Sequence, residues 1–388
     1  MPPSFDAVII GLGVMGSAAL AALARRGGRV VGIDRFAPGH DRGSSHGTTR
    51  VIRLGYFEHP SYVPLVRAAY PLWRELEARS GRPLMTITGI LEIGAPDSEL
   101  VAGTLRSSRL HDLPYEILDA PAVMKRFPAF RLPQDFVGVL QPDGGFVRAE
   151  LAAAALQKLA RRSGAELIRE QQVLAVEPHH DGVRVMTQRG DIHAGCAVVA
   201  VGPWLKSLLP QLPVAIRVTR QVLGWFEPAG HARRRFEADL FPVFLLQNPD
   251  GVFYGFPADT TGVKIAKHHH LDETADPDAY DRTISAADEA AIRVALKAHL
   301  PDADGALVAA QTCLYTMTPD GDFILDRMPE CPQIILASPC SGHGFKFAPV
   351  IGEILADLAV LGRTEHDISR FSLARFSLGM PSQASPAR

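Results

Sequence analysis

A glycine-rich turn near the start of the chain is the feature that most limits what this sequence can fold into. Gly11, Gly13 and Gly16 stand at GxGxxG spacing, directly after the apolar run 7–10, which predicts a buried strand. The pattern then predicts a helix and a second apolar strand, over 17–26 and 29–33. Together these elements form a strand–turn–helix–strand unit, an arrangement that holds a dinucleotide.

Each part of this unit has a physical role in binding a dinucleotide. Gly11 permits the tight turn, Gly13 lets the backbone approach a pyrophosphate, and Gly16 lets the helix pack on the strand. The helix N-terminus presents free N–H groups to the phosphates. Asp34, 18 residues after Gly16, is placed to reach a ribose hydroxyl, which favours NAD or FAD over NADP. The pattern does not choose between NAD and FAD, and an ordinary structural glycine turn is the alternative.

Composition places the chain among ordinary globular enzymes. Its 388 residues predict one large or two interleaved domains. It is 47% hydrophobic and 21% charged, with a net charge of −2 and no long run of like charge, so we expect no nucleic-acid or membrane-surface partner. No apolar run approaches about 18 residues, so no transmembrane span is expected. The chain enters its first strand with no room for a signal peptide, and we expect a cytoplasmic protein.

No metal site is predicted. The four cysteines, Cys196, Cys313, Cys331 and Cys340, form no CxxC pair and show no zinc-ligand spacing, which indicates thiols in a reducing compartment. The histidine run 268–270 is the other candidate. Consecutive side chains diverge on a strand, however, and no carboxylate or cysteine accompanies these histidines at ligand spacing.

The rest of the pattern alternates between two kinds of sheet. Apolar strands at 197–204 and 334–337 predict a return to the parallel sheet of the glycine turn. By contrast, 217–267 is β-rich and broken by Pro and Gly, which predicts a second, largely antiparallel sheet. Further helices are predicted over 62–80, 118–127, 146–163, 286–300 and 347–361, a strand pair within 85–94, and antiparallel strands over 173–176 and 183–187. The polar stretch 38–53 predicts a loop and a short helical or extended piece, in which Arg50 and Arg53 would share one helix face.

This alternation predicts an α/β fold in which two domains interleave. A Rossmann-like FAD-binding domain would comprise 1–84, 142–214 and 318–378. An α+β substrate domain on a mostly antiparallel sheet would comprise 85–141 and 215–317, followed by a disordered tail, 379–388. Two insertions into a nucleotide-binding domain suit a flavoenzyme better than a simple NAD dehydrogenase.

Five stretches make the prediction more specific: 43–53, 254–257, 263–265, 313–320 and 341–347. Two of them, Ser-Gly-His-Gly-Phe-Lys at 341–346 and Cys-x-Tyr-x-x-x-Pro-Asp at 313–320, are far more specific than the glycine turn. With these motifs the chain resembles the family of monomeric sarcosine oxidase and N-methyltryptophan oxidase, which are D-amino-acid-oxidase-like flavoproteins. The resemblance runs from about residue 6 to residue 376.

The resemblance implies oxidation of a secondary or N-methylated amino acid. A hydride passes from the carbon next to nitrogen to flavin N5, the resulting imine hydrolyses, and O2 reoxidises the flavin to give hydrogen peroxide. A monomer is expected, with a small amino acid and O2 as its only partners. The alternatives are a dehydrogenase of the same fold with another electron acceptor, and a non-catalytic flavin-binding protein.

The resemblance also assigns roles to the residues thought to act on the flavin. Cys313 matches the cysteine joined to the 8α-methyl group of FAD, although a small buried core residue is the usual role of a free cysteine. Lys264 matches a lysine near flavin N5 that is linked to oxygen activation, where positive charge stabilises superoxide. Its strand position fits a solvent-exposed lysine equally well. Arg50 and His46 match residues packed against the flavin, and with Lys264 they are the catalytic candidates.

Other matches concern the substrate and the cofactor. Arg53 and Lys346 match the pair that holds the substrate carboxylate, a task suited to a guanidinium and a point charge. Tyr254, His268 and Tyr315 match positions that line the substrate cavity. Beyond the glycine turn, Asp34, Cys313 and Lys346, the cofactor-binding candidates are Arg35, Ser44, Val173, Gly342, Gly344 and Phe345. The last helix would direct its N-terminal N–H groups at flavin N1 and the C2 carbonyl.

Departures from the family pattern put the substrate in doubt. Ser45 and Thr48 stand where a His and an Asp are usual, and 338–340 reads Ser-Pro-Cys where glycine and an apolar residue are typical. The cavity wall at 244–247 also differs from that of the sarcosine enzymes. A small N-methyl amino acid, N-methyltryptophan and a cyclic imino acid therefore all remain candidate substrates.

Overall fold

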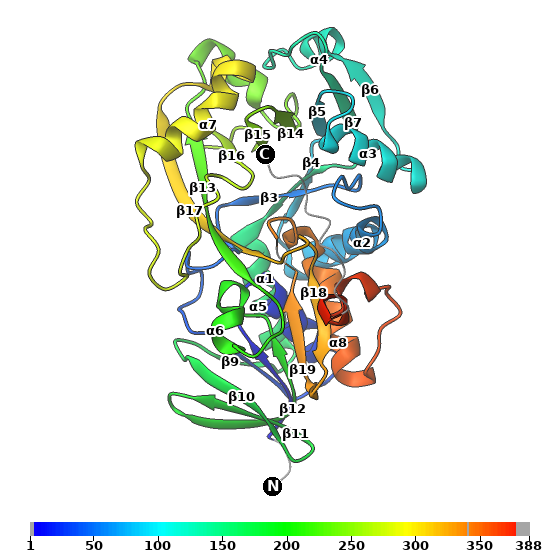
Figure 1. Ribbon diagram of the computed structural model, residues 1–388, viewed down its shortest axis with the longest axis vertical. Helices are drawn as coiled ribbons and strands as arrows, with labels where there is room; N and C mark the ends of the chain where they lie inside the picture. Colours follow the sequence, from blue (N-terminus) through cyan, green and yellow to red (C-terminus); the bar gives the residue numbers. More distant parts are fainter. Residues whose placement is uncertain (1–3, 340, 378–388) are drawn as a thin grey trace.

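The computed structural model describes residues 4–339 and 341–377 of the chain. It contains two large sheets with a small sheet between them, and helices that cover both large sheets (Figure 1). Cys340 and the tail predicted to be disordered, 379–388, lie outside the described residues. None of the described helices combines the length and the hydrophobicity that a membrane crossing requires.

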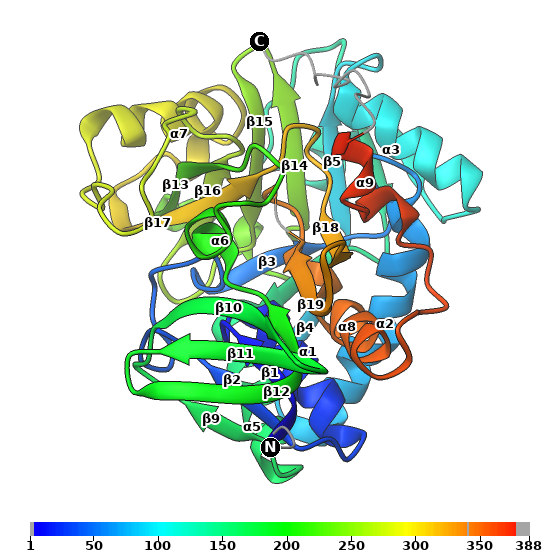
Figure 2. The same cartoon turned by 60° about the horizontal axis from the view of Figure 1, so that its bottom comes forward.

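The first sheet is centred on β1 (Phe5–Ile10) and has eight strands. Its central strands run parallel in the order β19-β12-β1-β2-β9, where β19 is Cys331–Ser338, β12 is Gly190–Val199, β2 is Val30–Ile33 and β9 is Glu166–Ile168. Antiparallel strands extend the sheet: β10 (Val173–His179) and β11 (Gly182–Thr187) beside β12, and β18 (Ile324–Met328) beside β19 (Figure 2). The predicted return to the parallel sheet is confirmed for 197–199 and 334–337, whereas 202–204, predicted as the end of the first of these strands, form a 3-10 helix.

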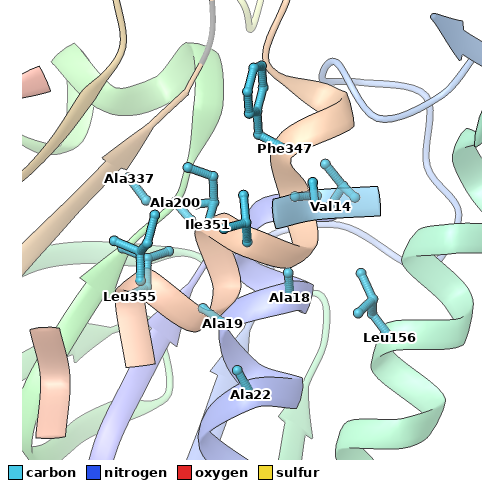
Figure 3. Packing of buried hydrophobic residues seen from close by; sticks show 14 of the residues in the cluster. Val14, Ala18, Ala19, Ala22, Leu156, Ala200, Ala337, Phe347, Ile351 and Leu355 are labelled. Carbon is cyan, nitrogen blue, oxygen red and sulfur yellow. The ribbon is translucent and has the colours of Figure 1, made fainter. Parts of the chain in front are cut away.

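Small side chains let the helices pack closely on this sheet. Helix α1 (Val14–Arg25) lies between α5 (Ala149–Arg162) and α8 (Ala348–Leu361), as Figure 3 shows with Ala18 and Ile351. A Cβ atom on Gly352 would come within 2.7 Å of the Ala18 carbonyl, so a larger residue would push α8 away. Close packing therefore fixes the N-terminus of α1 and, with it, the glycine turn. Helix α2 (Tyr62–Ser80) has the predicted bounds and packs against α8.

The second sheet also has eight strands, in the order β17-β13-β16-β15-β14-β5-β7-β6. In chain order they are β5 (Ile90–Gly94), β6 (Glu116–Asp119), β7 (Val137–Gln141), β13 (Arg217–Phe226), β14 (Val243–Asn248), β15 (Gly251–Phe256), β16 (Val263–Lys267) and β17 (Leu307–Met317). All neighbours are antiparallel except β14 and β5. Helices α3 (Glu99–Leu110), α4 (Ala120–Arg126) and α7 (Ala286–His299) pack against it. The predicted α/β fold class, with a mostly antiparallel second sheet, is confirmed.

A small antiparallel sheet between the two large ones corrects three local predictions. Its order is β3 (Thr49–Ile52), β8 (Gly145–Arg148) and β4 (Met85–Ile87) (Figure 1). Residues 49–52 are thus extended, so Arg50 and Arg53 do not share a helix face. Residues 146–148 are strand rather than helix, and β4 pairs with β8 rather than with β5. In each case pairing with a distant strand overrides the local pattern.

The remaining differences concern the ends of elements. Helix α1 begins at Val14, which places Gly16 in its first turn, and α4 begins at Ala120 because the preceding residues form β6. The short elements are α6 (Leu205–Leu208), α9 (Ala374–Ser377) and the 3-10 helices η1 (Gly202–Trp204), η2 (Gly230–Phe236), η3 (Pro301–Ala303), η4 (Phe345–Phe347) and η5 (Ser369–Phe371). The small sheet takes strands from both predicted domains, so the boundary near residue 84 stays a prediction.

Removing the Asp288 carboxylate is expected to destabilise the second sheet. Asp288, 1% exposed, accepts hydrogen bonds from Arg220 at 2.7 and 2.9 Å, and it also contacts His270 and Ser285. Because breaking a buried ion pair leaves the other charge uncompensated, Asp288→Ala should lower the free energy of unfolding by about 3–5 kcal/mol. Urea denaturation measures this. Asp239→Ala, which removes an exposed partner of Arg234, is the control, and equal effects of the two variants would contradict the expectation.

Candidate active site

A cavity of about 440 Å³ is lined by residues from both large sheets and from the loop after β2, and this volume is typical of ligand sites. Most of the predicted site residues line it: Gly11, Gly13, Asp34, Arg35, Ser44, Arg50, Arg53, Val173, Tyr254, His268, Cys313, Tyr315, Gly342, Gly344, Phe345 and Lys346. Gly16, His46 and Lys264 lie behind its wall. Segments separated by more than 300 residues in sequence therefore meet at one cavity.

The glycine turn at one end of this cavity has the geometry of a dinucleotide cradle. Gly11 has a φ of +89°, and a Cβ atom there would lie 2.6 Å from the carbonyl oxygen of Ala200. A Cβ atom on Gly16 would overlap the Gly11 carbonyl, which explains why α1 approaches β1 so closely. Asp34, at the end of β2, accepts the N–H of Leu12 at 2.7 Å. The carboxylate thus supports the turn as well as lining the cavity, and these residues fit a bound dinucleotide.

Arg50 and Cys313 both line the cavity and contact each other. Cys313 lies on β17 and is 3% exposed. Arg50 Nη2 donates to the Cys313 sulfur at 3.7 Å and to the Ser44 carbonyl at 3.0 Å. The Ser44 hydroxyl donates to the carbonyl of Leu314 at 2.5 Å. The loop after β2 is therefore tied to β17, with a guanidinium beside the thiol.

A strained turn before Arg50 is held by two charged side chains, the half-buried Glu150 and the buried Lys264. Thr48 has a φ of +61°, which is unfavourable for a β-branched residue. The Glu150 carboxylate accepts the N–H groups of Gly47 and Thr48, at 2.7 and 3.1 Å. Lys264 Nζ donates to the carbonyls of Gly47 and Thr49, at 2.5 and 2.8 Å. Lys264 is only 2% exposed, so the alternative of a solvent-facing lysine is wrong.

His46 lies behind this turn and is uncharged at neutral pH. It is 3% exposed, and its Nε2 donates to the Gly43 carbonyl at 3.1 Å. Burial, reinforced by the nearby Arg50 guanidinium, lowers the pKa of His46 to about 4. His46 can therefore support the loop that carries Arg50, while its part in catalysis stays a prediction.

Arg53 projects into the cavity and is held by a carboxylate that the sequence analysis missed. Its Nη2 donates to both oxygens of Glu58, at 2.8 and 2.6 Å, and its Nη1 donates to the Gly55 carbonyl. A second missed carboxylate, Glu92, lies 3.7 Å from Nη1. The rings of Tyr56 and Phe57 stack on the guanidinium. A ligand carboxylate would have to displace Glu58 or share Arg53 with it.

Lys346 is a further positive group of the cavity and lies close enough to Arg53 to feel its charge. Its Nζ donates to the carbonyl of His343 at 2.6 Å and to the Tyr56 hydroxyl at 3.3 Å. His343 Nε2 faces the Gly321 carbonyl, so it carries the proton and Nδ1 accepts the Tyr56 hydroxyl at 2.6 Å. Burial and the Arg53 charge lower the pKa of Lys346 to about 7, with Glu58 opposing them. Lys346 can therefore gain or lose a proton near neutral pH.

Aromatic residues form the wall near these cations. His268 Nδ1 lies 3.2 Å from the Tyr315 hydroxyl, and Tyr254 lines the same cavity. Gly342 has a φ of +84°, and a Cβ atom there would lie 2.5 Å from the Tyr315 ring, so only glycine fits. Burial lowers the pKa of His268 well below its usual value, and nearby cations lower it further. The imidazole is therefore neutral.

Two of the three consecutive histidines, His268 and His270, point to different partners. His268 contacts Tyr315, whereas His270 Nε2 lies 2.9 Å from the buried Asp288 carboxylate. Across residues 4–339 and 341–377, no three His, Cys, Asp or Glu side chains are grouped so that they could hold a metal ion. Of the two missed acids beside Arg53, Glu92 carried a signal, because it interrupts the apolar strand β5, whereas the position of Glu58 five residues after Arg53 predicts no contact.

Comparison with known proteins agrees with this geometry. The chain is 41% identical to monomeric sarcosine oxidase of Streptomyces avermitilis, covering 97% of this chain and 99% of that protein. It is 38% identical to N-methyl-L-tryptophan oxidase of Yersinia pestis, over 96% and 99% of the two chains. Among solved structures, NikD, an unusual amino acid oxidase essential for nikkomycin biosynthesis, matches with a TM-score of 0.82 and 30% identity, over 95% and 97% of the chains.

A family model described as FAD dependent oxidoreductase (DAO) matches residues 6–358. The match includes the glycine turn, both large sheets, and the Cys313 and Lys346 motifs. The family resemblance found in the sequence is thereby confirmed. The glycine turn left NAD and FAD open, and the family match favours FAD. The chain belongs to the DAO family of FAD-dependent oxidoreductases, together with monomeric sarcosine oxidase and N-methyltryptophan oxidase.

Proposed function

We propose that this protein is an FAD-dependent oxidase of a secondary α-amino acid, either N-methylated or cyclic. The observation that carries the proposal is the single cavity that joins a dinucleotide cradle to two buried cations, Arg53 and Lys346. A guanidinium and an ammonium group at one end of an aromatic cavity suit an α-carboxylate. The names of the two curated relatives, sarcosine oxidase and N-methyl-L-tryptophan oxidase, support an N-alkyl amino acid.

In this proposal the protein orients the substrate, and FAD held at the glycine turn and Asp34 would supply the hydride acceptor. Arg53 and Lys346 hold the carboxylate, which leaves the carbon next to nitrogen free to turn toward the cofactor. Tyr254 and Tyr315 keep water away from the reacting carbon. Because His268 is neutral, it does not repel the positive charge that develops on the substrate nitrogen.

Three further parts of the proposal come from the sequence. Cys313, in the wall of the cavity, would carry FAD covalently. The protein would act as a monomer and in the cytoplasm. Size-exclusion chromatography with light scattering checks whether the protein is a monomer, and cell fractionation checks whether it lies in the cytoplasm.

An anaerobic screen tests the proposed activity. N-methyl amino acids, N-methyltryptophan, proline and pipecolate are mixed with the yellow enzyme, and bleaching of the flavin is followed by absorbance. The methyl ester of the best substrate is the control, because it lacks the carboxylate that Arg53 and Lys346 are proposed to hold. Readmitted air should restore the colour with formation of peroxide. Bleaching without oxygen uptake would favour a dehydrogenase, and absence of bleaching by every compound would favour a non-catalytic flavoprotein.

Arg53→Lys is expected to raise KM more than it lowers kcat. The change keeps the charge but removes the planar pair of N–H donors that binds a carboxylate. The loss of one charged hydrogen bond costs about 1.5–3 kcal/mol, which corresponds to a KM increase of about 10- to 150-fold. Steady-state kinetics with the best substrate measure the effect, and Arg79→Lys on the surface of α2 is the control. An unchanged KM would exclude Arg53 from the carboxylate site.

A further inference from the structure

A buried carboxylate behind Arg53 has no role in the activity described so far. Glu92 lies in the middle of β5 and is 0% exposed. Neither of its oxygens has a hydrogen-bond partner among the described residues, and its Oε1 lies 3.7 Å from Arg53 Nη1. A buried carboxylate without a hydrogen-bond partner is costly, so its presence beside the cation of the carboxylate site calls for a physical reason.

The groups around Glu92 explain how it can change its charge. Its paired positions on β14 and β7 are the apolar Leu245 and Val139. On α3, Thr104 is close enough to lower the pKa of Glu92, although neither side chain has a partner with hydrogen-bond geometry. The charged groups that face Glu92 are Arg53 and Glu58 from the loop after β3, and Lys346 from η4. Burial raises the pKa of Glu92 to about 7, and the Arg53 guanidinium opposes this rise.

Arg53, Glu58, Glu92 and Lys346 form one charged cluster, whose net charge becomes more negative when an anion enters the cavity. Glu58 lines the cavity and accepts two hydrogen bonds from Arg53, so its negative charge already neutralises the guanidinium. A ligand carboxylate adds one negative charge to the same cluster. Of the three carboxylates then near Arg53, Glu92 is the one without hydrogen bonds and without contact with the cavity, so its charge is the least stable.

We propose that Glu92 takes up a proton from solvent when the substrate carboxylate binds to Arg53 and Lys346, and that this positioning residue thereby sets how carboxylate affinity depends on pH. One ligand anion and one proton enter the complex, Glu92 changes from carboxylate to carboxylic acid, and no bond in the ligand changes. The inference rests on the proposed function, because it requires that Arg53 and Lys346 hold a carboxylate.

The test uses an unreactive ligand, tetrahydrofuran-2-carboxylate, and isothermal titration calorimetry of the flavin-loaded enzyme from pH 6 to pH 9. Below pH 7 the wild type and Glu92→Gln should bind it alike. Above pH 7 the affinity of the wild type should fall more steeply, since both Glu92 and Lys346 must then be protonated. At pH 8 Glu92→Gln should bind about tenfold more tightly than the wild type.

Two controls separate this role from a structural one. Tetrahydrofuran-2-carboxamide, which is neutral, should bind both forms alike at every pH. Glu92→Asp keeps the carboxyl group and should keep the steep pH dependence. A purely structural role would instead lower the affinity of Glu92→Gln at all pH values and for both ligands, and that result would overturn the proposal.

Proton uptake by the wild type provides a measurement that needs no variant. Titrations at pH 8 in buffers of different ionisation enthalpy give the number of protons bound with the carboxylate. Lys346 can take up at most one of these protons. Glu58 and the three imidazoles that line the cavity, those of His40, His268 and His343, do not titrate at this pH. Uptake of more than one proton supports the role of Glu92, and uptake of one or fewer overturns it. Absence of any binding would overturn the carboxylate site itself.

Discussion

Replacing Cys313 by serine is expected to release essentially all flavin from the protein on acid precipitation, whereas the wild type should keep its yellow colour in the pellet. The Cys313 sulfur lies in the cavity wall, and the Arg50 guanidinium 3.7 Å away can stabilise negative charge on the sulfur as a bond forms. The variant should still bind FAD before denaturation, because the glycine turn and Asp34 remain. Absorbance of pellet and supernatant measures the partition.

Two other buried thiols provide matched controls for this experiment. Cys196 and Cys331 are each 6% exposed, and neither lines the cavity that Cys313 reaches. Serine at either position should leave the flavin in the pellet. Free flavin in the supernatant of the wild type would contradict a covalent bond, and retention in Cys313→Ser would place the bond at another residue.

The fold was predictable where local pattern and packing agree. Helix α2 has the predicted bounds because its apolar residues repeat at helical spacing and one face is buried against α8. The segment 49–52 was not predictable in this way. It has no strong periodicity, and its strand conformation comes from pairing with β8, almost a hundred residues later. A single sequence does not show directly which distant segments pair with each other in a sheet.

The same reasoning applies to the site. Arg53, Lys346 and Cys313 were found through motifs, and the structure brings all three to one cavity. The sequence could not show that Arg53 is held by Glu58, because the geometry of a loop decides which of several nearby acids makes the contact. Glu92 was detectable as a lone acid in an apolar strand, a signal that the family motifs do not include.

Lys264 shows why strand alternation alone does not identify a site residue. Its two apolar neighbours, Val263 and Ile265, place it on the opposite face of β16, and both a solvent face and a covered face fit that pattern. The fold covers it with Trp225 and Phe256, whose rings lie 5.4 and 4.6 Å from Nζ. Lys264 is thus a buried amine that feels the charge of Arg50, and not a surface lysine.

Replacing Lys264 by methionine is expected to slow reoxidation of the reduced enzyme by O2 about 10²- to 10³-fold, the usual cost of removing one preorganised charge-stabilising group. Reduction by substrate should change little, because Lys264 lies behind the cavity wall rather than at the carboxylate site. Stopped-flow absorbance measures the two half-reactions separately. Lys267→Met on the same strand is the control, since Lys267 is partly exposed. Equal losses in both half-reactions would contradict the assignment.

The protonation state of Lys264 adds a pH dependence to this prediction. Three oxygens, the carbonyls of Gly47 and Thr49 and the Thr49 hydroxyl, surround Nζ and suit the three protons of an ammonium group. Burial lowers the pKa of Lys264 well below its usual value, and Arg50 lowers it further. Because the charged form is the one that assists O2, reoxidation should slow as the pH rises, beginning well below the pH at which an ordinary lysine loses its proton. In Lys264→Met this decline should disappear, and a wild-type rate that stays constant up to pH 10 would show that the lysine acts without its charge.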